Sequence, residues 1–95
     1  MSDLIPKKDL NSWIKKIPEW ELEEDKSITR TVELDSFQEA IDFVNDVAEI
    51  AEEAQHHPDI DVRFSRVLVS LTTHDKGGLT QSDFEMAGRI DTLID

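Results

Sequence analysis

Cysteine is absent from the 95 residues of this chain. Its absence excludes disulfide bonds, thiolate nucleophiles and zinc sites built from cysteine. Long apolar runs are missing as well: the longest, over residues 67–71, is interrupted by Ser70, so we expect no membrane-spanning segment. The N-terminal MSDLIPKKDL has no apolar core of the kind that a signal peptide needs, and we expect a cytoplasmic protein.

Basic residues are few compared with acidic ones. Ten Lys and Arg stand against 22 Asp and Glu, which gives a formal net charge of −12. A surface of this kind repels phosphate backbones, so we expect neither nucleic acid nor an anionic membrane as a partner. The 38% hydrophobic content lies in periodic patterns and predicts a folded chain. A chain this short has a limited core, which association into an oligomer would supplement.

The spacing of apolar residues predicts seven elements in a single domain over residues 1–95. Their order, α-β-β-α-β-β-α, is typical of an α+β fold: a four-stranded antiparallel sheet with three helices on one face. Capping-box patterns, Ser36-x-x-Glu39 and Thr80-x-x-Asp83, mark two of the helix starts. The elements are a helix over 9–17 ended by Pro18, a strand around Trp20 and Leu22, a strand over 28–34 interrupted by Arg30, a helix over 37–55, strands over 60–64 and 67–72, and a helix over 81–93.

The long helix carries two apolar stripes, although a helix that covers a sheet needs only one. The second stripe either continues the core around the helix or forms a coiled-coil-like seam for a partner helix, and hence an oligomer. The first stripe is Phe37, Ala40, Ile41, Val44, Ala48 and Ala51; the second is Phe43, Val47, Ile50 and Ala54.

The second hairpin predicts where the histidines lie. A turn centred between Ser65 and Arg66 would pair the apolar residues of its two strands on one face. Continued outward, that register puts His57 opposite His74, although Pro58 interrupts the ladder there. We therefore expect all three histidines to meet at one end of the hairpin. The apolar pairs would be Phe64 with Val67, Val62 with Val69, and Ile60 with Leu71.

Three kinds of role are open to such a group of imidazoles. An unperturbed imidazole titrates near pH ~6.5 and can serve as general acid and general base, which suits a dehydration. A three-histidine metal site is a second possibility, although neighbouring His56 and His57 in extended chain point to opposite sides. Capping of carbonyls at the helix end is the third. Glu52, one turn before His56, would orient an imidazole, bind substrate or lie in solvent.

A linked set of motifs resembles the signature of the pterin-4a-carbinolamine dehydratases, also called 4a-hydroxytetrahydrobiopterin dehydratases. The set is far more specific than any of its parts, and the similarity extends over nearly the whole chain. The motifs are Glu52-x-x-x-His56-His57-Pro58, Thr73-His74 and Gly78-Leu79-Thr80-x-x-Asp83.

The resemblance implies a hydro-lyase that needs neither cofactor nor metal and dehydrates a 4a-hydroxytetrahydropterin to the quinonoid dihydropterin. That reaction supports tetrahydropterin recycling after a pterin-dependent aromatic amino acid hydroxylase has turned over. Carried over by position, the catalytic residues are His56, His57 and His74, with His56 and His74 as the acid/base pair and His57 chiefly holding substrate. Glu52, Thr73 and Asp83 would bind substrate, and Asp83 is equally well explained by helix capping.

The resemblance also implies a homodimer or homotetramer, since members of the family assemble in both ways. Tetramers in the family pair their long helices, which fits the seam interpretation of the second stripe. Some members also act as a coactivator that binds a transcription factor. A protein-interaction module is therefore the alternative function, with a metal-dependent hydrolase a third hypothesis.

Overall fold

The computed structural model describes residues 3–94. The predicted order of helices and strands is confirmed, and so is the α+β fold with a four-stranded antiparallel sheet. Two short 3₁₀ helices are added to the predicted elements. In chain order the elements are η1 (Lys7–Asp9), α1 (Leu10–Ile14), β1 (Glu21–Glu23), β2 (Ser27–Glu33), α2 (Phe37–Ala54), β3 (Asp59–Arg63), β4 (Arg66–Leu71), η2 (His74–Lys76) and α3 (Gln81–Ile94).

The first helix is shorter than the predicted 9–17. After Ile14, the backbone N–H groups of Lys16 and Ile17 donate to carbonyls three residues back, at 3.1 Å. Such i→i+3 bonds tighten the last turn of a helix and satisfy its unpaired carbonyls, and Pro18 follows immediately. The chain then turns to place Trp20 in the core just before β1.

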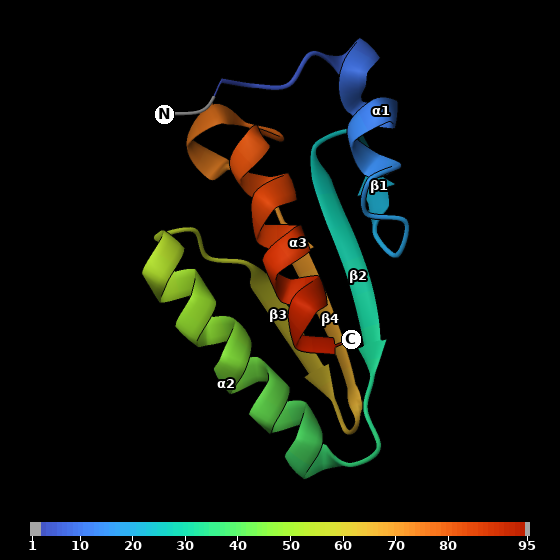
Figure 1. Cartoon of the computed structure of the whole chain (residues 1–95), viewed down its shortest axis with the longest axis vertical. Coiled ribbons are helices and arrows are strands. Elements are labelled where there is room, and N and C mark those ends of the chain that lie inside the picture. The colour runs from blue at the N-terminus through green and yellow to red at the C-terminus, as the bar shows by residue number, and fades with distance from the viewer. Residues whose placement is uncertain (1–2, 95) are drawn as a thin grey trace.

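The sheet has the strand order β1-β2-β4-β3, so β2 and β4 are its central strands. Figure 1 shows α2 and α3 lying over one face of this sheet, with α1 near β1 at one end. Ring contact between Trp13 of α1 and Phe84 of α3, with centroids 5.3 Å apart, joins the first helix to the helical layer. Among the helices of residues 3–94, none combines the length and apolar character that a bilayer crossing requires.

The predicted register of the second hairpin is wrong by two residues. Val62 pairs with Val67, and Ile60 pairs with Val69. The reason is Phe64, whose φ of 54° takes it out of the ladder and into a two-residue turn with Ser65. A bulky residue in this left-handed region costs about 1–3 kcal/mol. Because the side chains of a strand repeat every two residues, the error changes the partners but not the faces.

The corrected register removes the predicted pairing of His57 with His74. The ladder ends at Asp59 and Ser70, and β4 ends at Leu71. His74 instead opens η2, in the loop that follows β4. Any meeting of the histidines must therefore come from loops and not from cross-strand neighbours.

The long helix begins as predicted, because the Ser36 side chain accepts a hydrogen bond from the Glu39 backbone N–H at 3.1 Å. Its buried face takes residues from both predicted stripes. Phe43 and Val47, from the second stripe, are buried within one chain, so the core interpretation is right for these two residues. Ile50 is partly buried and Ala54 is exposed, so for them the seam interpretation stays a prediction. Phe37 and Ala48, from the first stripe, are exposed. The buried residues are Ala40, Phe43, Val47 and Ala51.

Arg30, the interruption in the second strand, reaches across to the last helix. Its Nη1 donates to Asp91 Oδ1 at 2.5 Å, and Trp20 Nε1 donates to the same oxygen at 2.8 Å. The two charged side chains are only 12% and 22% exposed. A poorly hydrated charge needs its counterion, so this pair joins α3 to the sheet.

Replacing Arg30 by Leu should therefore leave Asp91 with a single donor in a poorly solvated place. We expect the free energy of unfolding to fall by about 2–4 kcal/mol, somewhat less than for a fully buried pair. The measurement is urea unfolding followed by circular dichroism. Arg89→Leu is the matched control, because Arg89 pairs with Glu53 at the surface and such pairs contribute about 0–1 kcal/mol. Equal losses in the two variants would show that the Arg30 pair has no special role.

Candidate functional site

The C-terminal end of α2 determines where the histidine pair lies. Gln55 takes the left-handed conformation with φ 53°, and the next N–H, that of His56, donates to Ala51 O at 3.1 Å. The Gln55 N–H donates to Glu52 O at 3.4 Å. Together these two bonds form a Schellman motif, and Pro58 prevents the helix from resuming. The chain therefore turns sharply, and His56 follows directly after the turn.

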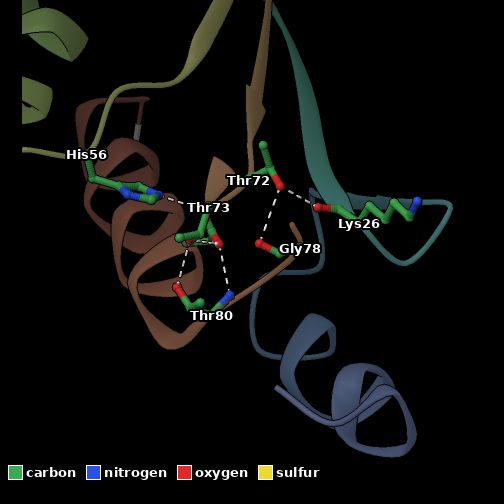
Figure 2. Close-up of polar contacts among 7 residues, drawn as sticks. Lys26, His56, Thr72, Thr73, Gly78 and Thr80 are labelled. Carbon is green, nitrogen blue, oxygen red and sulfur yellow. Dashed lines mark hydrogen bonds and ion pairs between the residues drawn. The ribbon is translucent and has the colours of Figure 1, made fainter. Parts of the chain in front are cut away.

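The loop after β4 places the third histidine. Thr73 N donates to Gly78 O at 2.9 Å, which closes a loop around η2, and Gly77 supplies the left-handed residue with φ 72°. Thr72 Oγ1 fastens this loop to the β1–β2 turn, since it donates to Lys26 O at 2.6 Å (Figure 2). His74 is presented at the exposed tip of the loop.

A buried carboxylate connects this loop to His56. Asp83, in the first turn of α3, is fully buried. Its Oδ1 lies 2.6 Å from His56 Nε2, and its Oδ2 accepts from Thr73 Oγ1 at 2.7 Å and from the Thr80 backbone N–H at 2.9 Å. Figure 2 shows the His56 ring pointing toward Thr73 and Thr80. The last of these bonds is also the capping contact that the sequence predicts.

The hydrogen bonds of this cluster have one consistent direction. The Thr73 hydroxyl donates its hydrogen bond to Asp83. In its 2.9 Å contact with Thr80 Oγ1, the Thr73 oxygen is therefore the acceptor and Thr80 the donor. A carboxylate can only accept, so His56 donates to it from Nε2. In the neutral ring Nδ1 is then the acceptor. The His56 side chain is 16% exposed, so its orientation is determined mainly by Asp83.

The three histidines line one cavity of about 220 Å³. His56 and His57 follow the end of α2, and His74 lies in the loop after β4. The prediction that the three histidines lie close together is therefore confirmed, although the register that led to it is wrong. His57 is largely exposed, and its Nε2 lies 2.6 Å from Glu52 Oε2. The cavity is lined by Gln55, His56, His57, Thr72, Thr73, His74 and Asp75.

The predicted site residues therefore occupy three kinds of position. The histidines and Thr73 line the cavity, Glu52 lies beside it against His57, and Asp83 lies behind His56 without reaching the surface. Thr72, Gln55 and Asp75 line the cavity but were not predicted. Each is adjacent in sequence to a predicted site residue, and this adjacency is the only feature of the sequence that could have indicated a place in the cavity.

Chemically, the cavity offers several proton-transfer groups and no built metal centre. Across residues 3–94, no three His, Asp or Glu side chains are grouped closely enough to hold a metal ion. The arrangement of His56 and Asp83 resembles other sites in which a buried carboxylate fixes the tautomer of an imidazole and stabilises its charged form. A small polar substrate with one proton to lose and one to gain suits such a cavity.

Comparison with known proteins identifies one family. The model of the pterin 4 alpha carbinolamine dehydratases matches residues 3–93. A Chloroflexus aggregans protein provisionally named pterin-4-alpha-carbinolamine dehydratase is 53% identical over 77 residues, which cover 81% of this chain and 82% of the relative. One with the same name from Picosynechococcus sp. is 45% identical over 93 residues, 98% of this chain and 100% of the relative.

A solved structure shares the fold as well. The crystal structure of a transcriptional coactivator/pterin dehydratase from Brucella melitensis matches this chain with a TM-score of 0.90. The match has 27% sequence identity and covers 96% of this chain and 98% of the other.

Substituting Asp83 by Asn should test the buried cluster. The amide retains one acceptor oxygen and introduces two donors, so it cannot serve His56, Thr73 and Thr80 together. We expect a loss of about 1–3 kcal/mol in the free energy of unfolding and a changed tautomer at His56, read from imidazole ¹⁵N shifts. Asp75→Asn, an exposed change in the same cavity, should alter stability by less than about 0.5 kcal/mol. An unchanged His56 spectrum in Asp83→Asn would contradict the assigned network.

Proposed function

Because the chain belongs to the pterin 4 alpha carbinolamine dehydratase family, a family of hydro-lyases, we propose that it dehydrates a 4a-hydroxytetrahydropterin to the quinonoid dihydropterin. The observation that carries the proposal is the cavity itself, which all three histidines of the chain line. The whole chain would act as one such domain, and the reaction would support tetrahydropterin recycling by forming the quinonoid dihydropterin, which a separate reduction would convert to the tetrahydropterin. A pterin-dependent aromatic amino acid hydroxylase would supply the substrate.

The reaction removes a proton from N5 of the pterin and a hydroxyl from C4a. The N5–H electron pair forms the N5=C4a double bond while the C4a–O bond breaks and the hydroxyl leaves as water. One base and one acid are therefore needed, and no electron is gained or lost. Side chains alone can supply both, so the proposal invokes no cofactor and no metal.

His56 is the base in this proposal, and His74 is the acid. Asp83 supports this assignment because a carboxylate at Nε2 stabilises the imidazolium that forms when Nδ1 takes a proton. His74 is exposed on a loop and can deliver a proton to the leaving hydroxyl. Asp83 acts through His56 and is therefore a positioning residue.

His57 would hold the substrate, with Glu52 keeping its ring in place. Thr73 lines the cavity, but its hydroxyl is occupied by Asp83 and Thr80. Its contribution to binding would come from the backbone and methyl group, and its hydroxyl would serve the His56 network.

The test follows the decay of a 4a-hydroxytetrahydropterin by absorbance, against its spontaneous loss. We expect the wild type to accelerate decay, and His56→Ala and His74→Ala each to lower kcat by about 10²–10⁴, the usual contribution of a general acid or base. Glu52→Gln should raise KM with a smaller effect on kcat. Glu53→Gln, on the next residue of the same helix, is its matched control and should change neither.

A wild type no faster than the background would remove the dehydratase proposal. Loss of activity with a chelator and its return with zinc would favour the metal-dependent alternative instead. Full activity in both histidine variants would contradict the proposed roles of His56 and His74 as general base and general acid.

A role as a protein-interaction module is the second candidate. The Brucella melitensis protein, which shares the fold, is described as a transcriptional coactivator/pterin dehydratase. Such a role is compatible with catalysis, and it would stand alone only if His56 and His74 proved dispensable for the function of the protein in the cell.

A further inference from the structure

The N-terminal segment lies beside the loop that joins η2 to α3 (Figure 1). Leu4 forms an isolated antiparallel bridge with Thr80, and the Ile5 N–H donates to Leu79 O at 2.9 Å. We call Leu4 and Ile5 the clasp. Ile5 packs against the core, whereas Leu4 is 49% exposed, so the clasp lies on the loop at the surface of the molecule.

The clasp forms the outer edge of a short ladder of three chain segments. The middle segment is residues 78–80, which are all buried. On the side away from the clasp, the Thr73 N–H donates to Gly78 O at 2.9 Å, and these two residues form a second isolated bridge. The middle segment therefore has backbone partners on both sides, and release of the clasp would leave one of those sides open to water.

The middle segment supports both residues that are proposed to carry protons. At its first residue, Gly78 O accepts the hydrogen bond that closes the loop presenting His74. At its last residue, the Thr80 N–H donates to Asp83 at 2.9 Å, and Asp83 bonds to His56 at 2.6 Å. Figure 2 shows Gly78 and Thr80 on one continuous stretch of chain. A displacement of this stretch therefore changes the position of His56 relative to His74.

Gly78 allows the clasp to come close to the middle segment. A Cβ atom placed on Gly78 would lie 3.0 Å from Leu4 Cδ2, whereas carbon atoms in favourable contact are about 3.5–4.0 Å apart. The backbone of Gly78 is not in the left-handed region, unlike that of Gly77. The missing side chain at Gly78 therefore serves the approach of Leu4 and not the turn of the backbone.

The clasp is only lightly packed on its flanks. Two cavities, of about 460 Å³ and about 410 Å³, are both lined by Leu4, Ile5 and Pro6. The backbone contacts with residues 79–80 therefore supply much of the attachment of the clasp. Segments with few buried contacts open locally at a small cost in free energy. The clasp can thus open while the sheet stays folded.

We infer that Leu4 and Ile5 are positioning residues for the proposed reaction. While the clasp is attached, residues 78–80 stay in place, and the distance between His56 and His74 is fixed. Acid and base must reach the substrate in one geometry, so a small displacement of either lowers the rate. Leu4 and Ile5 lie outside the lining of the histidine cavity, so they act through the middle segment and do not touch substrate. The kinetic part of this inference rests on the proposed function, whereas its structural part can be measured without substrate.

Leu4→Ala tests the inference, because it weakens the clasp and leaves every residue of the cavity unchanged. Amide hydrogen exchange should show that the protection of the Thr73 and Thr80 N–H groups falls together with that of Ile5. The imidazole ¹⁵N shifts should show that His56 no longer keeps the single tautomer with Nε2 protonated. In the dehydration assay, kcat should fall about 2- to 30-fold, the range expected for coupling through a contiguous network, with a smaller change in KM.

Two further variants separate positioning from general stability. Leu4→Met retains a long apolar side chain that can cover Gly78, so it should keep the kcat and the His56 shifts of the wild type. Leu68→Ala is the matched control, because Leu68 is another exposed leucine and belongs to β4. It should leave the His56 shifts and kcat unchanged even where it lowers the melting temperature.

Unchanged His56 shifts in Leu4→Ala, together with unchanged exchange at Thr73 and Thr80, would overturn the inference. Equal losses of kcat in Leu4→Ala and Leu68→Ala would overturn it as well, because a general loss of stability would then explain both. A wild type without dehydratase activity would remove the proposed function instead, and the exchange and ¹⁵N measurements would still decide whether the clasp positions His56.

Discussion

A single buried carboxylate holds the site together. Asp83 joins the end of α2, the loop after β4 and the start of α3, and it has donors from all three. A carboxylate removed from water costs several kcal/mol unless its oxygens are hydrogen-bonded. His56, Thr73 and the N–H of Thr80 must therefore be in place together, and the orientation of the proposed base follows from that requirement.

The chain uses its acidic residues in two different ways. Most lie at the surface, where they contribute little to stability and set the net charge. Asp83 is fully buried and Asp91 is mostly buried, and each accepts several hydrogen bonds and joins α3 to another part of the fold. The last helix is thus held to the rest of the molecule by polar contacts at both ends and by apolar contacts such as that of Ile90 between them.

Much of the fold could be predicted from periodicity alone, because strand and helix spacings differ clearly in this chain. The hairpin register could not, since it depends on Phe64 entering a left-handed conformation against the preference of its residue type. The buried face of α2 also escaped prediction: with apolar residues nearly all round, sequence spacing cannot say which of them meet the sheet. Arg30 interrupts the alternating pattern of its strand. The reason for a charged residue at this position is its bond to Asp91, which lies 61 residues away in the sequence.

The candidate site was predictable in part of its membership but not in its arrangement. The histidines, Thr73 and Asp83 all belong to motifs that resemble those of a known family, so their identities could be read from the sequence. Their geometry depends on contacts between residues far apart in the chain. The bond of Asp83 to Thr80 could be foreseen as a cap, whereas its bond to His56 is a tertiary contact that local pattern cannot reveal.

The N-terminal residues take part in this arrangement from the other side. Leu4 forms an isolated bridge with Thr80, and Ile5 N–H donates to Leu79 O at 2.9 Å, so the N-terminal segment lies against the loop that leads into α3 and to Asp83. The candidate site thus combines the end of α2, the loop after β4 and the start of α3, with the N-terminal segment packed behind the last of these. During synthesis on the ribosome it can form only after the start of α3 has emerged, so a nascent chain that already has its sheet still lacks the Asp83 cluster.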